Sequence, residues 1–238
     1  MLPTVAIPTY QRSQSIVVNT LAFLHAEGYP SELITLFVAD QEEEQNYLRD
    51  VPSHLYKNIV VGVKGLAQQR NFISDYYPEG QILLQLDDDV AGVKILQGTF
   101  LELVQAGLKT LEEGCGLWGI MPNDDGRRLR MESTLHLTHI IGSIFLCKNH
   151  KEFRLEMSEK EDYLRSIWYF KKYGKVCRFR GAGVKTTYNK GTGGLIQLGR
   201  EEHMRQGAQS VYSKYPECCS IIVKKGMPDL RLNWRACQ

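Results

Sequence analysis

The sequence of 238 residues is first characterised by patterns that it lacks. Its six cysteines form no C-x-x-C pair, so a structural zinc site is not expected, and we predict reduced, mostly buried thiols. The pattern G-x-x-x-x-G-K-[ST] does not occur, and no G-x-G-x-x-G follows the first predicted strand. These absences exclude the P-loop and dinucleotide-binding ways of holding a nucleotide.

Long apolar runs and targeting signals are also missing. No apolar stretch approaches the roughly 20 residues that span a bilayer, and the first residues, MLPTVAIPTYQR, lack the basic start and apolar stretch of a signal peptide. We therefore expect a cytoplasmic protein. The composition, with 43% hydrophobic and 24% charged residues, is that of an ordered globular chain.

Strand and helix patterns alternate over residues 1–95. Near-continuous apolar strands separated by helices predict an α/β fold with a mostly parallel central sheet and helices on both of its faces. In such a sheet the ligand binds beyond the carboxyl ends of the strands. The strands are expected at 4–10, 32–40, 58–63 and 81–89, and the helices at 13–28, 41–51 and 65–77.

The rest of the chain is less regular. Two amphipathic helices are expected, at 98–114 and at 158–174, the second with Ser158 as its N-cap and an acidic first turn. Because no linker or repeat is present, we predict a single domain over residues 1–238. Further strands are expected at 116–122, 139–147 and 175–188, followed by the glycine-rich segment NKGTGGLIQLG.

Three consecutive carboxylates, Asp87, Asp88 and Asp89, follow the apolar run QILLQL at the predicted ligand edge of the sheet. Such neighbours repel one another unless positive charge compensates them. Mg²⁺ and Mn²⁺ take carboxylate oxygens and commonly bridge them to substrate phosphates. The triplet therefore predicts a divalent-cation site. His136 and His139 form H-x-x-H, but two polar positions near a strand explain this pair more simply than a metal does.

Two other segments are suited to the phosphates of a ligand. Lys64 and Arg70 flank the start of a predicted helix in VKGLAQQRN, and Lys190 precedes Gly191, Gly193 and Gly194. Glycines let backbone N–H groups approach a phosphate closely, and lysine supplies a point charge.

The series VAIPTYQR, VAD, GVKGLAQQRN, LLQLDDD and EKED, taken in this order, resembles a GT-A glycosyltransferase of the large inverting family. The likeness extends over nearly the whole chain. GVKGLAQQRNFISDYYPEGQILLQLDDDV and KGTGGLIQLGR are more narrowly similar to the TET/JBP-associated glycosyltransferases of bacteriophages, which modify hydroxymethylated pyrimidines in DNA. The resemblance implies a nucleotide-sugar-binding half at 1–95, an acceptor and catalytic half at 96–238, and a phage-encoded protein in the host cytoplasm.

The resemblance also implies roles for individual residues. Asp162 corresponds to the catalytic base, with Glu161 as its alternative, and Gly142 and Ser143 would shape the acceptor pocket. Asp87 and Asp89 would hold Mn²⁺ or Mg²⁺, with His203 as a further ligand. The nucleotide-sugar, expected to be a UDP-sugar, would be bound by Pro8, Thr9, Tyr10, Arg12, Asp40, Lys64, Gly65, Arg70, Asp87, Asp88, Lys190, Gly193 and Gly194.

The uneven charge distribution has two explanations, a polyanionic partner or a solvated surface with a phosphate-binding site. Residues 1–169 hold 15 Lys and Arg against 23 Asp and Glu, whereas residues 170–238 hold 14 against 4. With Tyr188, Tyr212, Tyr215 and Trp234, this basic third is suited to a DNA backbone and its bases. Three alternatives stay open: a glycosyltransferase acting on a surface glycan, a nucleotidyltransferase with a similar sheet, and a nucleic-acid-binding module without catalysis.

Overall fold

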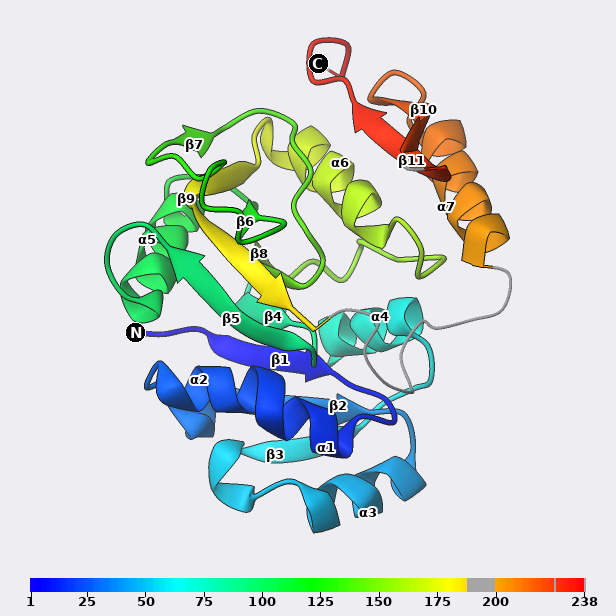
Figure 1. Cartoon of the computed structure of the whole chain (residues 1–238). Helices are drawn as coiled ribbons and strands as arrows, with labels where there is room; N and C mark the ends of the chain where they lie inside the picture. The colour runs from blue at the N-terminus through cyan, green and yellow to red at the C-terminus, as the bar shows by residue number, and fades with distance from the viewer. Residues whose placement is uncertain (188–199, 225, 238) are drawn as a thin grey trace.

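The computed structural model describes residues 1–187, 200–224 and 226–237. The first half of the central sheet contains four parallel strands in the order β3-β2-β1-β4 (Figure 1). All four were expected from their apolar runs. Their bounds are β1 (Thr4–Pro8), β2 (Ile34–Val38), β3 (Asn58–Val61) and β4 (Ile82–Leu86).

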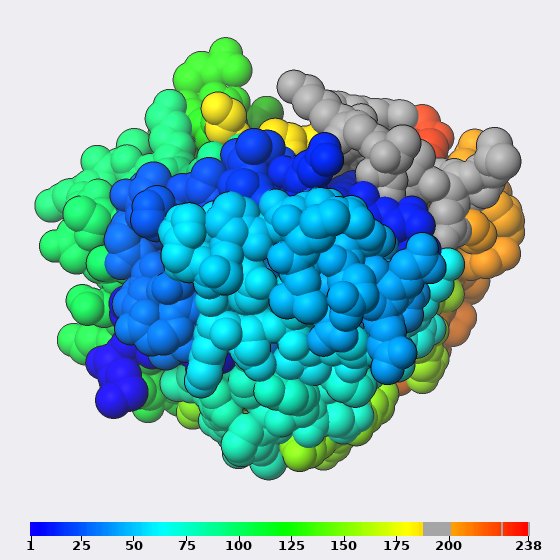
Figure 2. Space-filling view, turned by 90° about the horizontal axis from the view of Figure 1, so that it is seen from below, coloured from blue at the N-terminus to red at the C-terminus, as the bar shows by residue number. Residues whose placement is uncertain are grey.

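The predicted helices between these strands are present. The first is continuous but consists of α1 (Ser13–Ile16), a π-helical turn η1 (Val17–Leu21) and α2 (Ala22–Ala26). The others are α3 (Gln41–Asp50) and α4 (Leu66–Tyr76). Seen from below, the blue and cyan segments of this half cover most of the molecular face (Figure 2).

The sheet continues with strands of mixed direction in the full order β3-β2-β1-β4-β8-β6-β9-β5. Strand β8 runs antiparallel to β4 and β6, β9 runs parallel to β6, and β5 runs antiparallel to β9. The short β7 pairs with β9. The bounds are β5 (Val90–Ile95), α5 (Phe100–Glu112), β6 (Leu117–Met121), β7 (Ser133–Thr134), β8 (Ile144–Lys148), α6 (Glu161–Tyr173) and β9 (Cys177–Thr186).

Alternate residues of the four parallel strands contribute to two different cores, one on each face of the sheet. Val5 and Ile7 of β1 belong to the core under α1, α2, α3 and α5, whereas Ala6 belongs to the core under α4 and α6. The same alternation separates Leu84 from Leu83 on β4. Because successive side chains of a strand point to opposite faces, a fully apolar strand needs cover on both. The predicted fold class is therefore confirmed.

The C-terminal region departs from the sequence-based expectation. Helix α7 (Arg200–Lys214) packs against a hairpin of β10 (Cys219–Lys224) and β11 (Met227–Leu232), which lies beside α6 (Figure 1). The hairpin and β5 were not predicted. Cys218 and Cys237 form a disulfide, so the prediction that all six cysteines are thiols is wrong. The other four are buried and free, as expected.

Helix α6 begins three residues later than predicted. Its N-cap is Lys160, in the left-handed conformation with φ 62°, and not Ser158. The Ser158 hydroxyl instead accepts a hydrogen bond from the backbone N–H of Ala67, in the first turn of α4, at 3.1 Å. Among the described residues, no helix has the length and hydropathy needed to cross a membrane.

Candidate active site

The acidic triplet forms the turn between β4 and β5, at the carboxyl end of the parallel strands where a ligand was expected. Thr20, in the π-helical segment η1, holds the backbone of the acidic turn in place with two hydrogen bonds. Its hydroxyl donates to the carbonyl oxygen of Asp87 at 2.8 Å and accepts from the N–H of Val90 at 3.0 Å. The main chain of the triplet is therefore held on both sides by one side chain.

Two arginines compensate part of the charge of the triplet. Arg12 Nη1 lies 2.8 Å from Asp88 Oδ1 and 3.6 Å from Asp89 Oδ2. Arg70 Nη2 donates to Asp87 Oδ1 at 2.8 Å. The other oxygen of Asp88 accepts from the Thr9 hydroxyl at 2.7 Å, so both of its oxygens are engaged by protein groups. This leaves Asp87 and Asp89 as the better candidates for a metal.

Burial makes the triplet hard to ionise fully. It raises the pKa of Asp89 to about 7, and the charges of Asp87 and Asp88 add to the effect. The pKa values of Asp87 and Asp88 are also raised, by burial above all, although Arg70 and Arg12 respectively oppose the shift. Bound divalent charge would favour the ionised forms.

The donor set fits a cation that keeps open positions. Mg²⁺ is usually held by one or two carboxylates together with substrate phosphates and water, and Asp87 and Asp89 would supply such carboxylates. Within residues 1–187, 200–224 and 226–237, no three His, Cys, Asp or Glu side chains form a metal-ligand group. The described structure thus gives no support to His203, on α7, as an additional ligand.

The other residues predicted to bind the donor occupy different positions. Tyr10 and Lys64 lie together, with Lys64 Nζ 5.1 Å from the centre of the Tyr10 ring. Gly65 is the N-cap of α4 and has φ 98°, in the region that favours glycine. Asp40 caps α3 by accepting from the N–H of Glu43 at 2.9 Å. Pro8 is the last residue of β1, which pairs with β4, the strand that precedes the triplet.

Arg70 lies beneath the site instead of facing a ligand. Its side chain is only 4% exposed, and Nη2 also donates to the carbonyl oxygen of Gly142 at 2.9 Å. The backbone N–H of Asp87 donates to the carbonyl oxygen of Ser143 at 2.9 Å. Gly142 and Ser143, predicted to shape the acceptor pocket, thus lie next to the triplet. Lys190, Gly193, Gly194 and Tyr188 are outside the described residues.

The two predicted catalytic carboxylates have different environments. Glu161 is buried, forms an ion pair with Arg165, and lies 3.6 Å from Arg70 Nη2. It is therefore an internal ion-pair partner, and its assignment as the alternative base is corrected. The next residue, Asp162, is 18% exposed, and its Oδ2 lies 2.6 Å from His139 Nε2. His139 was not predicted to belong to this site.

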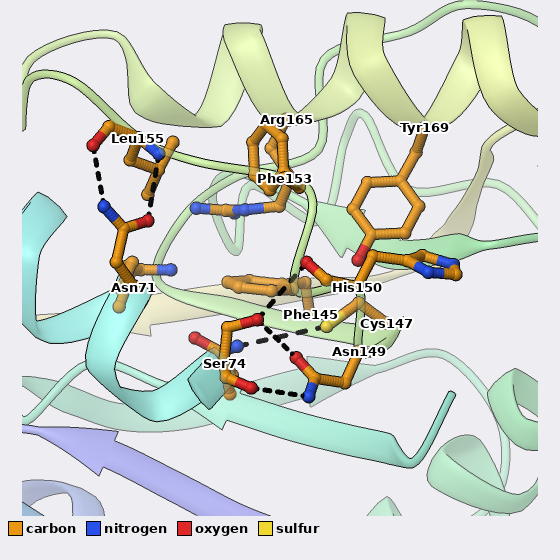
Figure 3. Close-up of a pocket in the computed structure, with 12 residues that line it drawn as sticks. Asn71, Ser74, Phe145, Cys147, Asn149, His150, Phe153, Leu155, Arg165 and Tyr169 are labelled. Atoms are coloured by element: carbon orange, nitrogen blue, oxygen red, sulfur yellow. Dashed lines mark hydrogen bonds between the residues drawn. The ribbon is translucent and has the colours of Figure 1, made fainter. Parts of the chain in front are cut away.

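A small cavity of about 30 Å³, lined by Arg70 and Arg165, lies between α4, α6 and β8 (Figure 3). The Arg165 guanidinium covers the Phe145 ring at 3.8 Å, and Arg70 lies 5.2 Å from the same ring. Three buried guanidinium nitrogens, Nε and Nη1 of Arg70 and Nη1 of Arg165, and the Gln85 side-chain oxygen have no hydrogen-bond partner among the described residues. Donors and an acceptor around a polar space of this size are typical of a site for ordered water.

Comparison with known proteins identifies the fold. No family model and no curated protein sequence matches the chain. Solved structures do match it, including glucosyl-3-phosphoglycerate synthase from Mycobacterium tuberculosis in complex with Mn²⁺, UDP-glucose and phosphoglyceric acid. That likeness has 10% identity and a TM-score of 0.57, over 97% of this chain and 86% of that protein.

Two further structures are similar. GalNAc-T7 with UDP, GalNAc and Mn²⁺ has 13% identity and a TM-score of 0.53, and S. aureus TarS has 14% identity and a TM-score of 0.52. The likenesses cover 91% and 89% of this chain, but only 51% and 66% of those proteins. At these identities the shared property is the fold, so the chain has the GT-A fold of glycosyltransferases.

Proposed function

We propose that the protein is a metal-dependent glycosyltransferase that moves a sugar from a nucleotide-sugar, most simply a UDP-sugar, to an acceptor hydroxyl with inversion. One observation carries the proposal. The triplet at the end of β4 and the N-terminus of α6, which carries Asp162, are joined by Arg70, which contacts Asp87 and lies 3.6 Å from Glu161. A metal and donor site beside a proton-accepting site is what an inverting transfer requires.

Different residues would bind the metal, bind the nucleotide and accept the proton. Asp87 and Asp89 would hold Mn²⁺ or Mg²⁺, which neutralises the charge of the leaving diphosphate when bound. Tyr10 and Lys64 would contact the nucleotide, and Arg12 keeps Asp88 and Asp89 in place. The proton of the acceptor hydroxyl would be taken up at the Asp162 end of α6.

For the acceptor we propose 5-hydroxymethylpyrimidine in DNA, and with it a phage-encoded protein acting in a host cytoplasm. Support comes from the sequence resemblance and from the excess of Lys and Arg after residue 169. A flipped base could then reach the site at Gly142 and Ser143 while basic side chains contact the backbone.

A surface glycan is the second candidate acceptor, and two observations favour it. Acidic residues from the first 169 positions pair with part of the C-terminal positive charge, in Lys172–Glu152, Arg180–Glu132 and Lys214–Glu156. These ion pairs neutralise part of the positive charge that residues 170–238 carry in the sequence. The Cys218–Cys237 disulfide is also more typical of oxidising compartments than of the cytosol.

The test is incubation with Mn²⁺, a panel of UDP- and GDP-sugars, and two acceptor sets, namely duplex DNA with or without 5-hydroxymethylcytosine and a set of soluble glycans. Products are read by mass spectrometry. Transfer to hydroxymethylated DNA alone supports the DNA acceptor, whereas transfer to glycans alone replaces it with the second candidate. If no nucleotide-sugar is consumed and none binds in calorimetry, the glycosyltransferase proposal is wrong.

A further inference from the structure

The contact between His139 and Asp162 fixes both side chains at the start of α6. His139 Nε2 lies 2.6 Å from Asp162 Oδ2, and the exposed fractions of the two side chains are 20% and 18%. Asp162 Oδ1 accepts from the backbone N–H of Tyr163 at 2.9 Å. Both carboxylate oxygens of Asp162 therefore already have a hydrogen-bonding partner in the protein.

The charge of Asp162 determines which nitrogen of His139 carries a proton. Burial acts to raise the pKa of Asp162, but the hydrogen bond from His139, together with the charge of Lys160, holds it below the ordinary value. An ionised carboxylate can only accept hydrogen bonds, so Nε2 is the donor in this contact. In a neutral imidazole the other nitrogen, Nδ1, then has a lone pair that can accept a proton.

The neighbouring side chains also hold the imidazole ring in a fixed plane. The Tyr163 ring stacks on it, with centroids 4.2 Å apart and planes inclined by 16°. The Tyr163 hydroxyl donates to Asp229 Oδ1 on β11 at 3.0 Å, and Lys160 Nζ donates to the same oxygen at 2.7 Å. Arg178 Nη1 donates to the carbonyl oxygen of His139 at 3.2 Å. The C-terminal hairpin thus helps to orient a histidine on a distant loop.

We propose that His139 is the proton acceptor of the transfer reaction and that Asp162 is its positioning residue; this inference rests on the proposed function. The acceptor oxygen attacks the anomeric carbon as its O–H bond breaks and its proton passes to His139 Nδ1. The bond from the anomeric carbon to the donor phosphate oxygen breaks, and its electron pair stays on the leaving diphosphate. Asp162 stabilises the resulting imidazolium, which later releases the proton to water.

Two substitutions separate proton acceptance from positioning. His139→Gln keeps an N–H group near the place of Nε2, and so keeps the hydrogen bond to Asp162, but it has no nitrogen that can accept a proton. His139→Ala removes both functions and leaves space for a small base. The matched control is His136→Ala, three residues earlier, because the His136 ring stacks on Trp234 at 4.9 Å and makes no hydrogen bond to Asp162.

Turnover is measured at saturating Mn²⁺ with the nucleotide-sugar and acceptor that the panel above selects. We expect both His139 variants to lose about 10²–10⁴-fold in kcat, the range of general base catalysis, with the KM for the nucleotide-sugar unchanged. Added imidazole should raise the kcat of His139→Ala by at least about tenfold and should leave the kcat of His139→Gln unchanged. His136→Ala should keep kcat within about threefold of the wild type.

Melting curves and nucleotide-sugar binding show whether each variant is folded, and the near-isosteric His139→Gln is the variant on which the inference depends. If His139→Gln turns over within about threefold of the wild type, His139 only orients Asp162 and the inference is wrong. A His139→Ala loss that imidazole does not relieve would also overturn it. If the wild type itself transfers no sugar, the proposed function fails first, and this inference fails with it.

Discussion

Replacing Glu161 by Gln tests whether this residue holds the structure or takes part in the reaction. The side chains of Glu161 and Arg165 are 6% and 3% exposed, and Arg165 has Glu161 as its ion-pair partner. Removing one member of a buried pair costs about 3–5 kcal/mol, because the other charge is left uncompensated. In this variant Arg70 still donates to Asp87 and to the carbonyl oxygen of Gly142, so only Arg165 loses its ion-pair partner. The glutamine side-chain oxygen can still accept a hydrogen bond. We therefore expect a loss near 3 kcal/mol.

The measurement is urea unfolding, supported by thermal melts in which roughly 2–4 °C is lost per kcal/mol for a chain of this size. The matched control is Glu201→Gln, which breaks the Glu201–Arg205 pair. That pair has the same spacing on a helix but is 58% and 62% exposed, and it should cost less than about 0.5 kcal/mol. If Glu161→Gln is as stable as the control yet transfers no sugar, Glu161 is catalytic and our interpretation of the network is wrong.

Three further predictions concern the metal, the disulfide and Gly142. Because metal binds the ionised carboxylate, the rise in melting temperature caused by Mn²⁺ should grow as pH increases through about 7, the pKa of Asp89, and should disappear in Asp89→Asn. Equal Mn²⁺ shifts in melting temperature at about pH 5.5 and 8 would contradict a role of Asp89 in metal binding. Without metal, the free energy of unfolding should fall as pH rises towards about 7, because the native state keeps a proton that the unfolded state has released. Cys237→Ser should lower the free energy of unfolding by roughly 3 kcal/mol, as expected for a link across 19 residues, and reductant should then have no further effect in urea titrations. Gly142→Ala places a Cβ 2.7 Å from Glu161 Oε1, so a loss of about 1–3 kcal/mol is expected, and unchanged stability would show that the network adjusts freely.

The first half of the fold could be predicted because β1, β2 and β4 are buried on both faces. ITLFV and ILLQL each contain only one polar residue, which indicates a sheet covered on both faces, and the triplet directly after ILLQL marks the expected ligand edge. The hairpin β10–β11 could not be predicted in this way. Its residues are mostly exposed or half-buried, and its pairing depends on packing against α7.

The site was predicted only in part, because the partners of each charge come from distant segments. No short sequence motif contains both His139 and Asp162, or both Arg12 and Asp88, because the members of each pair lie far apart in the chain. The different environments of Glu161 and Asp162 had no clear signal in the sequence. Glu161 precedes the buried Leu164 and Arg165 by three and four residues, but Asp162 precedes the buried Arg165 and Ser166 by the same spacings.

The position of Arg70 makes the two halves of the site thermodynamically dependent on each other. Its Nη2 is shared between Asp87, Gly142 and the more distant Glu161, so one cation balances the donor edge of the sheet and the helix that carries Asp162. If a ligand that engages Asp87 changes the affinity of a second ligand beside α6, the second ligand must change the affinity of the first by the same factor. Cooperativity between two ligands can therefore be carried by a single guanidinium, without movement of a domain.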